Sequence, residues 1–485
     1  MAKKYVVLCL SVFLVCLSIV AQTQEKAQNR EVSKRLIAQI DLSSLIVETF
    51  KVSPDSKRVA YVAEENNKQF VVIDSNKGKQ YDYIVEIIFS QDSKHIAYKA
   101  KIGNKWLMVV DGKEDEKLYD VIWQSPIFSP DSKHIAYIAE EDNKHLVVVD
   151  GKEGKKYDHI GYESLIFSPD SKRLAYVAQV YKENFVDWFV VVNGKEEKRS
   201  DLNFIKESSL VFSDDSNRLA YVAGWSQKLP TKYFMTHNKY FVVVDDKKNK
   251  EYYGRILYLI FTPDSKRLVY VAEEYGKWFV VVDEKEGKKY DYIGYESLIF
   301  SLIFSPDSKR LAYVAEEDNK QFVVVDGKEG KKYNSISSLI FSPDSKRVAY
   351  AAGVGNKRFV VVDGKEGRQY DGIGEGTLIF SPDSKRVAYA AKVGDKWFVV
   401  VDGKEEKQYD NIGEGTLIFS PDSKRVAYVA QVGDKRFVVV DGKEGKQYDS
   451  IVGIGGGRIV FDSPDSLHYL AQIKNSIYLI EELIK

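Results

Sequence analysis

The chain has 485 residues, of which 44% are hydrophobic and 29% charged, a composition typical of a folded globular protein rather than a disordered one. Lysine plus arginine and aspartate plus glutamate number 71 each, so no net positive charge draws the chain to nucleic acid. Tyrosine (32) and phenylalanine (24) are abundant while proline (11) is scarce, which favours β-strands.

The N-terminal segment has the order of a secretory signal peptide. Two lysines precede an uncharged, mostly apolar segment, residues 6–20, and a polar stretch follows Ala21. We predict cleavage just after Ala21, which makes residues 1–21 the signal peptide, residues 22–33 a short linker and the mature protein periplasmic or secreted. An uncleaved N-terminal anchor is the alternative, although the apolar segment is shorter than the roughly 20 residues that span a bilayer. We therefore expect no stable membrane insertion after cleavage.

From about residue 34 the chain consists of tandem repeats. The phrase Phe-Ser-Pro-Asp-Ser-Lys recurs eleven times, strictly or degenerately, at spacings of 37 to 49 residues and often 39. Repeats this regular leave no stretch for an unrelated domain. The third position of the phrase is occupied by Pro54, Gln91, Pro130, Pro169, Asp214, Pro263, Pro306, Pro343, Pro382, Pro421 and Pro464.

Each repeat predicts four short antiparallel strands. In one late unit these are residues 378–381, 386–391, 397–402 and 408–412, joined by turns that contain Pro-Asp-Ser-Lys, Gly-Asp-Lys and Gly-Lys-Glu. The strands are apolar on both faces, so each small sheet must be covered on both sides. Sheets stacked radially around an axis satisfy this requirement without helices. The predicted fold is therefore an all-β propeller.

The repeated sequence Phe-Ser-Pro-Asp-Ser-Lys-Arg-Val-Ala-Tyr-Val-Ala resembles the TolB-type, WD-repeat-like propeller repeat of bacteria. The resemblance covers nearly everything from about residue 34 to the end and implies a bacterial exported propeller. The chain lacks room for the α/β domain that precedes the TolB propeller, and for the peptidase domain of dipeptidyl-peptidase-like proteins. The resemblance therefore does not transfer either of those functions.

Eleven repeats exceed the four to eight blades typical of one ring. We expect two consecutive propellers, residues 34–255 with about five blades and residues 256–485 with about six. One large ring is the alternative. The last unit supplies only three strands, so we expect residues 35–40, which precede the first repeat, to provide its fourth strand and close the ring.

No catalytic or metal-binding motif is recognisable in the sequence. Most polar residues are copied from blade to blade, so the Pro-Asp-Ser-Lys and Asp-Gly-Lys-Glu segments are interpreted as turn caps and solvated charges. The only cysteines, Cys9 and Cys16, lie in the signal peptide, which argues against a zinc site. We predict no cofactor, no metal and no catalytic residue. The six histidines are scattered, and His95 and His134 replace the usual arginine of the repeat: His95, His134, His145, His159, His237 and His468.

Glutamates recur in the segments that lead into the first strand of a repeat. In propellers such segments approach the centre, so an acidic collar for a cation or a basic peptide is one hypothesis. Its members are Glu163, Glu207, Glu296, Glu375 and Glu414, with Glu86 at a related position.

The fifth repeat breaks the pattern, because its second turn grows to residues 224–239, and the fourth repeat has a smaller extension at residues 180–187. Loops on rigid scaffolds often carry binding residues, and large aromatic side chains dominate binding interfaces. The predicted binding residues are Trp225, Tyr233, Phe234, Met235, His237 and Tyr240. An insertion that only covers neighbouring blades is the alternative.

Together these observations predict a non-enzymatic, exported binding scaffold for a protein, peptide or glycan. A propeller lyase or hydrolase with acidic residues at the channel mouth is the second hypothesis, and a structural surface-repeat protein is the third.

Overall fold

The computed structural model describes residues 25–27, 30–41, 43–183, 185–198, 203–226, 238–294, 302–451 and 457–485. The predicted signal peptide, residues 1–21, lies outside these residues. Within them the regular secondary structure is β-strand, apart from one 3-10 turn, η1 (Glu207–Ser209). No helix in this described part is long and apolar enough to cross a membrane. The predicted all-β propeller of four-stranded antiparallel sheets is confirmed.

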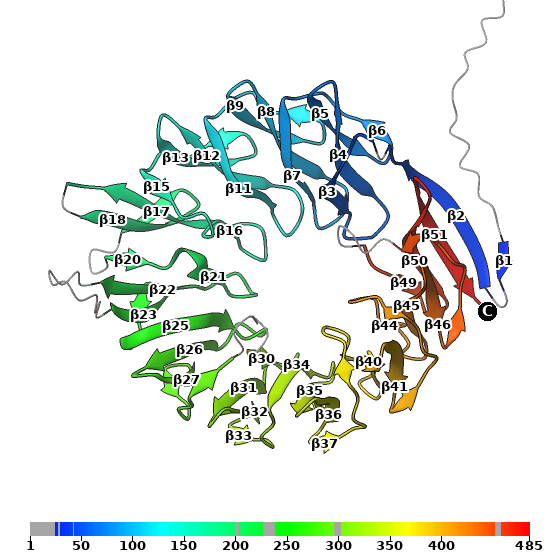
Figure 1. Cartoon of the computed structure of the whole chain (residues 1–485). Helices are drawn as coiled ribbons and strands as arrows, with labels where there is room; N and C mark the ends of the chain where they lie inside the picture. The colour runs from blue at the N-terminus through cyan, green and yellow to red at the C-terminus, as the bar shows by residue number, and fades with distance from the viewer. Residues whose placement is uncertain are drawn as a thin grey trace, which may run out of the picture.

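The strands form eleven units, which we call blades 1 to 11 in chain order. Figure 1 shows the blades side by side around one circle, with first strands such as β7, β16 and β44 nearest the centre. Blade 1 contains β3 (Leu45–Val52), β4 (Val59–Glu65), β5 (Lys68–Ile73) and β6 (Asn76–Lys77); blade 2 contains β7 (Tyr83–Phe89), β8 (Ile96–Ile102), β9 (Lys105–Val110) and β10 (Lys113–Glu114); blade 3 contains β11 (Val121–Phe128), β12 (Ile135–Glu141), β13 (Lys144–Val149) and β14 (Lys152–Glu153).

In several blades the first strand is divided in two by a bulged segment. Blade 4 contains β15 (His159–Ile160), β16 (Ile166–Phe167), β17 (Leu174–Tyr181), β18 (Val186–Val192) and β19 (Lys195–Lys198); blade 5 contains β20 (Phe204–Ile205), β21 (Val211–Phe212), β22 (Leu219–Ser226), β23 (Asn238–Val244) and β24 (Lys247–Lys248); blade 6 contains β25 (Tyr252–Phe261), β26 (Leu268–Glu274), β27 (Lys277–Val282) and β28 (Lys285–Glu286); blade 7 contains β29 (Tyr292–Ile293), β30 (Leu302–Phe304), β31 (Leu311–Glu317), β32 (Lys320–Val325) and β33 (Lys328–Glu329).

The last four blades close the circle, and the final one includes N-terminal strands. Blade 8 contains β34 (Ser335–Phe341), β35 (Val348–Val354), β36 (Lys357–Val362) and β37 (Lys365–Glu366); blade 9 contains β38 (Gly372–Ile373), β39 (Ile379–Phe380), β40 (Val387–Val393), β41 (Lys396–Val401) and β42 (Lys404–Glu405); blade 10 contains β43 (Asn411–Ile412), β44 (Ile418–Phe419), β45 (Val426–Val432), β46 (Lys435–Val440) and β47 (Lys443–Glu444); blade 11 contains β48 (Ser450–Ile451), β49 (Val460–Ser463), β50 (Ser466–Ile473), β51 (Ser476–Ile484), β2 (Arg30–Gln39) and β1 (Glu25–Ala27).

The fourth strand of each blade differs from the prediction. Residues 408–412 were expected to form it in blade 9, but the fourth strand there is β42, which pairs with β41. Tyr409 makes only a single bridge to Trp397, and Asn411 and Ile412 already belong to blade 10. The short Lys-Glu pair closes the sheet because Asp402 and Gly403 adopt positive φ and turn the chain back tightly.

Buried apolar side chains connect every blade to the next. The described residues form eleven apolar clusters, and each cluster joins two consecutive blades. The cluster that contains Val222 of blade 5 and Tyr270 of blade 6 crosses the expected domain boundary, and another joins blade 11 to blade 1. Each buried valine or tyrosine stabilises the stack by roughly 1.5–3 kcal/mol relative to an exposed one.

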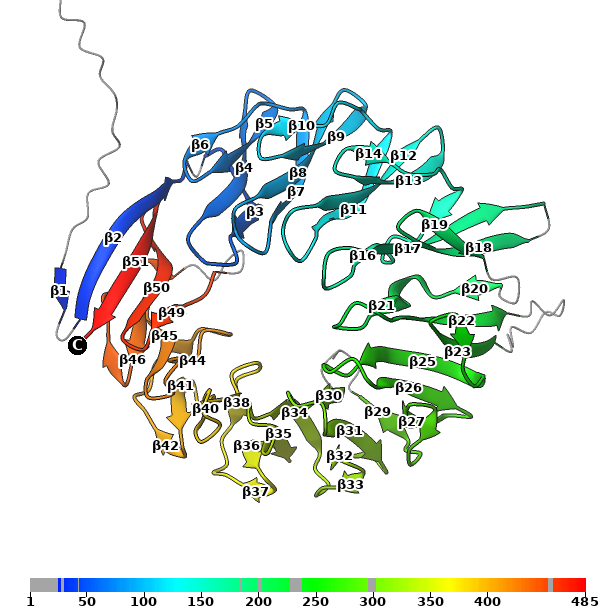
Figure 2. The same cartoon turned by 180° about the vertical axis from the view of Figure 1, so that it is seen from behind.

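The preferred division into propellers at residues 34–255 and 256–485 is not confirmed. That boundary falls inside β25, which pairs with blade 5 through Tyr252 and with blade 6 through Ile256. Two separate rings would need an apolar interface between blades 5 and 1, whereas blade 5 packs against blade 6. The circle in Figures 1 and 2 is the single large ring, the alternative.

The ring is closed by strand exchange, as predicted. Strand β2 pairs antiparallel with β51, so the N-terminal strand completes the C-terminal blade. The predicted linker, residues 22–33, is wrong in part, because β1 and the start of β2 lie within it. Arg30, nearly fully buried, donates to Glu482 Oε2 at 2.8 Å, and Tyr469 donates to the same carboxylate at 2.5 Å. This buried network fixes the register of the closing strand.

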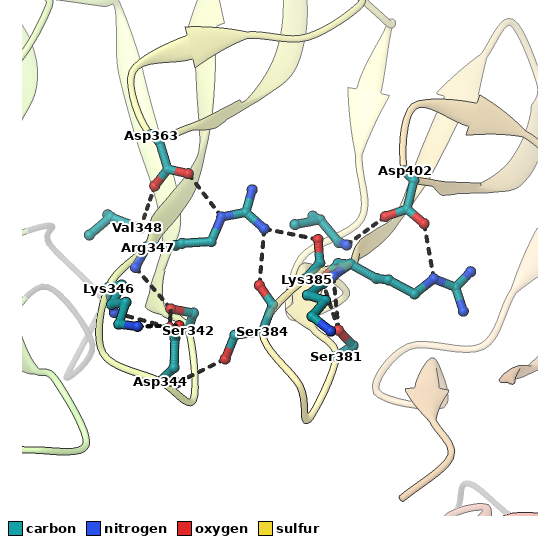
Figure 3. Close-up of polar contacts among 12 residues, drawn as sticks. Ser342, Asp344, Lys346, Arg347, Val348, Asp363, Ser381, Ser384, Lys385 and Asp402 are labelled. Carbon is teal, nitrogen blue, oxygen red and sulfur yellow. Dashed lines mark hydrogen bonds and ion pairs between the residues drawn. The ribbon is translucent and has the colours of Figure 1, made fainter. Parts of the chain in front are cut away.

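The Pro-Asp-Ser-Lys turns form hydrogen bonds within each turn and also between neighbouring blades. Ser381 Oγ donates to Asp383 Oδ1 at 2.6 Å, which holds the pKa of Asp383 below its usual value. Across the blade boundary, Asp344 N donates to Ser384 Oγ at 2.8 Å and Arg347 donates to the Ser384 carbonyl at 3.0 Å (Figure 3). The Asp-to-Ser bond recurs at nine consecutive boundaries, with lengths of 2.8 to 3.1 Å. We call this chain of bonds the turn belt.

Candidate binding surface

The described glutamates of the predicted acidic collar, Glu163, Glu207, Glu375 and Glu414, lie within bulged first strands, not between blades. In blade 9 the bulge is held by Thr377, whose hydroxyl donates to Gly374 O at 2.7 Å and accepts from Ala390 N at 3.0 Å. Ser164 and Thr416 hold the corresponding bulges of blades 4 and 10. The hydroxyl replaces backbone pairing that the bulge interrupts, so the intervening residues project from the strand.

These carboxylates do not converge. Glu163, Glu375 and Glu414 are exposed and Glu207 is half-buried, while Glu296 lies outside the described residues. No group of three or more metal-ligating side chains occurs in the described part of the chain. The collar stays a prediction. Sequence reasoning missed a further member, Glu48, which precedes the bulge-closing Thr49 of blade 1.

Two of the six predicted binding residues are described. Trp225 lies on β22 with 39% of its surface exposed, and Tyr240 lies half-buried on β23, where its ring meets Phe204 edge-on at 5.8 Å. Tyr233, Phe234, Met235 and His237 lie outside the described residues. The insertion is shorter than predicted, because Ser226 pairs with Asn238 and extends the hairpin beyond Gly224.

Between blades 3 and 4 the structure assembles a cluster that the sequence analysis treated as scattered residues. The Tyr162 ring lies 4.9 Å from Trp123, 5.8 Å from His145 and 5.1 Å from His159. The two histidine rings are 5.1 Å apart. His145 is the second residue of the third strand of blade 3, and His159 is the first residue of the first strand of blade 4, so the turn-back between these two strands brings them together.

Carboxylates flank this cluster on both sides. Trp123 Nε1 donates to Glu140 Oε2 at 2.8 Å, and His145 Nε2 lies 3.5 Å from the same oxygen. His159 Nε2 lies 3.3 Å from Glu207 Oε1, to which Gln179 donates at 3.1 Å. Burial lowers the pKa of His145, His159 lowers it further, and Glu140 opposes both. The cluster therefore presents a neutral His145 among aromatic rings and hydrogen-bond acceptors.

Further aromatic side chains continue from this cluster along the same end of the ring, where the second turns and the beginnings of the first strands lie. Ring pairs occur at Tyr83–Trp106 (6.3 Å), Trp188–Phe204 (6.0 Å) and Trp278–Tyr292 (5.3 Å). We call the set the aromatic arc, which runs from blade 2 to the start of blade 7: Tyr83, Trp106, Trp123, Tyr162, Tyr181, Phe185, Trp188, Phe204, Trp225, Tyr240, Tyr253, Tyr275, Trp278 and Tyr292.

The arc could have been found from the sequence by aligning the repeats on one tyrosine. Tyr119, Tyr157 and Tyr290 each bridge the start of the third strand of their own blade, at Trp106, His145 and Trp278. The same position is Arg358 in blade 8 and Arg436 in blade 10. His95 and His134, by contrast, are surface substitutes for arginine, because each lies 2.7 Å from the aspartate that arginine contacts elsewhere.

A pocket of about 560 Å³ lies in the inner part of blades 7 to 9. Its walls are apolar side chains of first strands, and Glu375 of the blade 9 bulge is the charged residue among the described lining. The apolar lining includes Ile303, Phe304, Ile340, Phe341 and Leu378. This pocket and the aromatic arc occupy different blades.

No family model matches the chain, and no curated protein matches it. Solved structures that it resembles are β-propellers of low identity. The β-propeller domain of the trilobed protease from Pyrococcus furiosus is 13% identical over 59% of this chain and 94% of that one, with a TM-score of 0.30. TolB from Acinetobacter baumannii is 12% identical over 64% and 79%, with a TM-score of 0.24. Oligogalacturonate lyase from Vibrio parahaemolyticus is 10% identical over 74% and 97%, with a TM-score of 0.28.

Proposed function

We propose that this propeller is an exported, non-enzymatic binding scaffold that holds a protein, peptide or glycan on its aromatic arc. The observation that supports this function is the arc itself, because it gathers large aromatic side chains at one end of about half the ring. Aromatic residues supply large contact areas at low entropic cost and are enriched at binding hot spots. Tyr181, Phe185 and Trp225 are the anchors we test, since they lie on the adjacent blades 4 and 5 and each exposes between 39% and 60% of its surface.

The test uses the partner that immobilised protein captures from the cell envelope, and then measures its dissociation constant with two variants. Tyr181→Ala, Phe185→Ala and Trp225→Ala together should weaken binding at least tenfold, or about 1.4 kcal/mol. The control replaces Val354, Val393 and Val432 with alanine. These valines lie at the second turns of blades 8 to 10 and are 45% to 48% exposed. Equal losses in both variants would contradict the assignment to the arc.

Export is part of the proposal. The order of residues 1–21, basic then apolar then polar, supports a cleaved signal peptide, and mass spectrometry of the native protein should find an N-terminus close to Ala21. Recovery of intact Met1 in a membrane fraction would favour the uncleaved anchor.

A propeller enzyme is the second candidate, favoured by the His159–Glu207 contact beside the aromatic cluster. One variant distinguishes the two candidate functions. Glu207→Gln keeps a hydrogen-bond acceptor beside Gln179, so a scaffold should retain binding within about twofold, while an enzyme that uses this carboxylate as an acid or base should lose roughly 100-fold or more in turnover.

A further inference from the structure

The arginine that follows a Pro-Asp-Ser-Lys turn lies in a cage made by its own blade and the next one. Arg347 of blade 8 donates through Nε to Asp363 Oδ2 at 2.9 Å. Through Nη1 it donates to the carbonyl oxygens of Ser384 and Lys385 of blade 9, both at 3.0 Å (Figure 3). Its guanidinium also lies 5.2 Å from the ring centre of Phe380, within the range of a cation–π contact. We call this set of one carboxylate, two carbonyls and one phenyl ring the guanidinium cage.

The same four groups surround an arginine at three further blade boundaries. The arginine nitrogens lie 2.7 to 3.3 Å from the carboxylate and carbonyl oxygens, and the guanidinium lies 5.2 to 5.7 Å from the phenyl centre. These arginines are Arg58, Arg310 and Arg386. The ring therefore contains its own template for the recognition of a guanidinium group.

Blade 3 has no arginine at this position, because His134 replaces it. His134 Nδ1 lies 2.7 Å from Asp150 Oδ2, so the histidine uses the carboxylate of the cage. A histidine side chain is shorter than an arginine side chain, and His134 makes no side-chain hydrogen bond to any residue of blade 4 that the structure describes. The rest of the cage, which consists of Ser171 O, Lys172 O and the Phe167 ring, is thus not contacted by the residue that fills it elsewhere.

A pocket of about 300 Å³ lies at this boundary between blades 3 and 4. His134, Ser171, Lys172 and Phe167, which are the cage residues described above, form part of its lining. Apolar side chains extend the lining away from the cage: Val147, Val149, Leu174 and Tyr176. The pocket therefore combines acceptors for a guanidinium group with apolar surface for the methylene groups of an arginine side chain.

His134 supplies a further acceptor to this pocket. A carboxylate only accepts hydrogen bonds, so the contact with Asp150 places the proton of the neutral ring on Nδ1. Nε2 of that ring is then an acceptor. A guanidinium group has five N–H donors in a rigid planar fork, which can reach several acceptors at once, whereas the ammonium of lysine is compact and strongly hydrated. The acceptor set therefore favours arginine over lysine.

The charged residues around the pocket are of the same types as those around the Arg347 cage. The pocket is lined by Lys152, Glu153, Lys172 and Arg173. The corresponding residues at the Arg347 boundary are Lys365, Glu366, Lys385 and Arg386. Arg173 is directed to blade 5, where it donates to Ser216 O at 3.0 Å. A guanidinium group is thus already held among such charges elsewhere in the ring.

One residue of the lining opposes a cation. Asn193 occupies the position of Asp402 in blade 9, since each accepts from the backbone N–H that follows the arginine, at 2.9 Å. Asn193 Nδ2 also donates to Lys172 O at 3.4 Å, a long bond that leaves this carbonyl a second lone pair. Because the pocket has one carboxylate fewer than the template, a small anion is the competing occupant.

We propose that the pocket between blades 3 and 4 binds a guanidinium group carried by a ligand. The group donates to Ser171 O, Lys172 O and His134 Nε2 and lies against the Phe167 ring, as arginine does in the complete cages. The inference is independent of the partner on the aromatic arc, which lies at the other end of the strands.

The test measures dissociation constants for the full chain by ligand-observed saturation-transfer NMR at constant ionic strength. N-acetyl-arginine amide is the probe, and N-acetyl-lysine amide should bind roughly tenfold or more weakly. Methylguanidinium distinguishes the carrier. If it binds as tightly as the arginine probe, the guanidinium alone is recognised; if it binds more weakly, the arginine stem contributes, and a peptide arginine is the source. Both results support the inference.

The decisive variant is His134→Arg, which fills the cage with the chain's own guanidinium. It should weaken binding of N-acetyl-arginine amide roughly tenfold or more and melt no lower than the wild type, so loss of folding does not explain the result. The control, His95→Arg, makes the same change between blades 2 and 3, where the His95 ring packs 6.5 Å from Phe128, and should change binding less than about twofold.

Three outcomes would overturn the inference. The first is equal binding of the arginine and lysine amides, and the second is equal losses in His134→Arg and His95→Arg. The third is tighter binding of inorganic phosphate than of N-acetyl-arginine amide, strengthened by His134→Arg, which would make the pocket an anion site.

Discussion

The aromatic arc and the same end of blades 8 to 10 share one backbone but present different chemistry. In blade 4 the start of the first strand is His159 and the third strand carries Trp188; in blade 8 the corresponding residues are Ser335 and Arg358. Residues 378–405 of blade 9 and 417–444 of blade 10 are nearly identical, yet two of their three differences, Lys392 against Gln431 and Trp397 against Arg436, also fall at this end.

The packing between blades is the same in the aromatic half of the ring and in the other half. Tyr157 and Tyr176 pack edge-on at 6.2 Å in the aromatic half, and Tyr370 and Tyr389 do so at 6.3 Å in the other half. The turn belt also runs through both. Repetition therefore maintains the interfaces between blades, while the exposed end varies and determines what each sector of the ring can bind.

The largest expected effect is the loss of partner binding when the insertion of blade 5, in the aromatic half, is removed. Replacing residues 227–237 with Asn-Gly, a pair suited to a tight hairpin turn, should leave the protein folded, because Ser226 already pairs with Asn238 across the β22–β23 hairpin. Binding of the captured partner should fall at least tenfold, or about 1.4 kcal/mol. Calorimetry and binding titration measure the two properties. Loss of cooperative melting would instead make the insertion a structural cover.

The turn belt should contribute equally to the free energy of unfolding in both halves of the ring. Ser171→Ala in blade 4 and Ser384→Ala in blade 9 each remove the acceptor of one Asp N–H, at 2.9 Å and 2.8 Å. Each should lower the free energy of unfolding by about 1 kcal/mol, as measured by urea denaturation. A difference well above this between the two variants would show that the halves differ inside as well as at the surface.

His145 should make the stability of the aromatic half depend on pH. Its folded pKa is lowered, chiefly by burial, so the unfolded chain binds a proton more readily and stability falls as pH drops below the ordinary histidine value of 6.5. His145→Gln should remove this part of the loss. Gln321, at the same position in blade 7, accepts from Ile336 N at 2.8 Å, just as His145 accepts from Ile160 N at 3.2 Å.

Melting temperatures of wild type and His145→Gln between pH 7.5 and 5 give the measurement, with the difference expected to widen in favour of the variant as pH falls. His134→Gln is the control, because His134 is exposed and lies outside the cluster. Parallel curves for the wild type and His145→Gln would contradict the prediction.

The smallest effect concerns two half-buried carboxylates, one in each half. Burial raises the pKa of both Asp115 and Glu406, although Tyr137 and Tyr428 donate hydrogen bonds to them. A raised folded pKa means that the ionised form destabilises the fold at neutral pH. Asp115→Asn and Glu406→Gln should each raise the free energy of unfolding at pH 7 by less than about 1 kcal/mol, with the gain vanishing near pH 3. Destabilisation at pH 7 would show that ionised tyrosine–carboxylate bonds outweigh burial.

Much of the scaffold could be predicted from the sequence, because repetition shows each strand and turn many times. The closing strand was also predictable, since the last unit lacks one strand and residues 35–40 have no blade of their own. The number of rings could not be predicted, because all blade interfaces use the same kinds of valine and tyrosine side chains. The fourth strand was misplaced because Tyr409 has strong strand propensity, while Lys404 and Glu405 pair through backbone alone.

The candidate site was predictable only in part. Trp225 and Tyr240 stood out because the insertion breaks the repeat. His145 and His159 did not stand out, because they belong to different blades. Only the turn-back of the chain between the two strands places their ring centroids 5.1 Å apart.

The pairing of β2 with β51 also sets the order in which this protein can mature. Arg30 and Ile484 come from opposite ends of the chain, so the last blade cannot be completed until the final strand has been synthesised. Earlier blades can stack as they emerge, but the two outermost blades each keep an uncovered apolar face until that late event. Contacts of such long sequence separation form slowly, so ring closure should be the slow step of refolding.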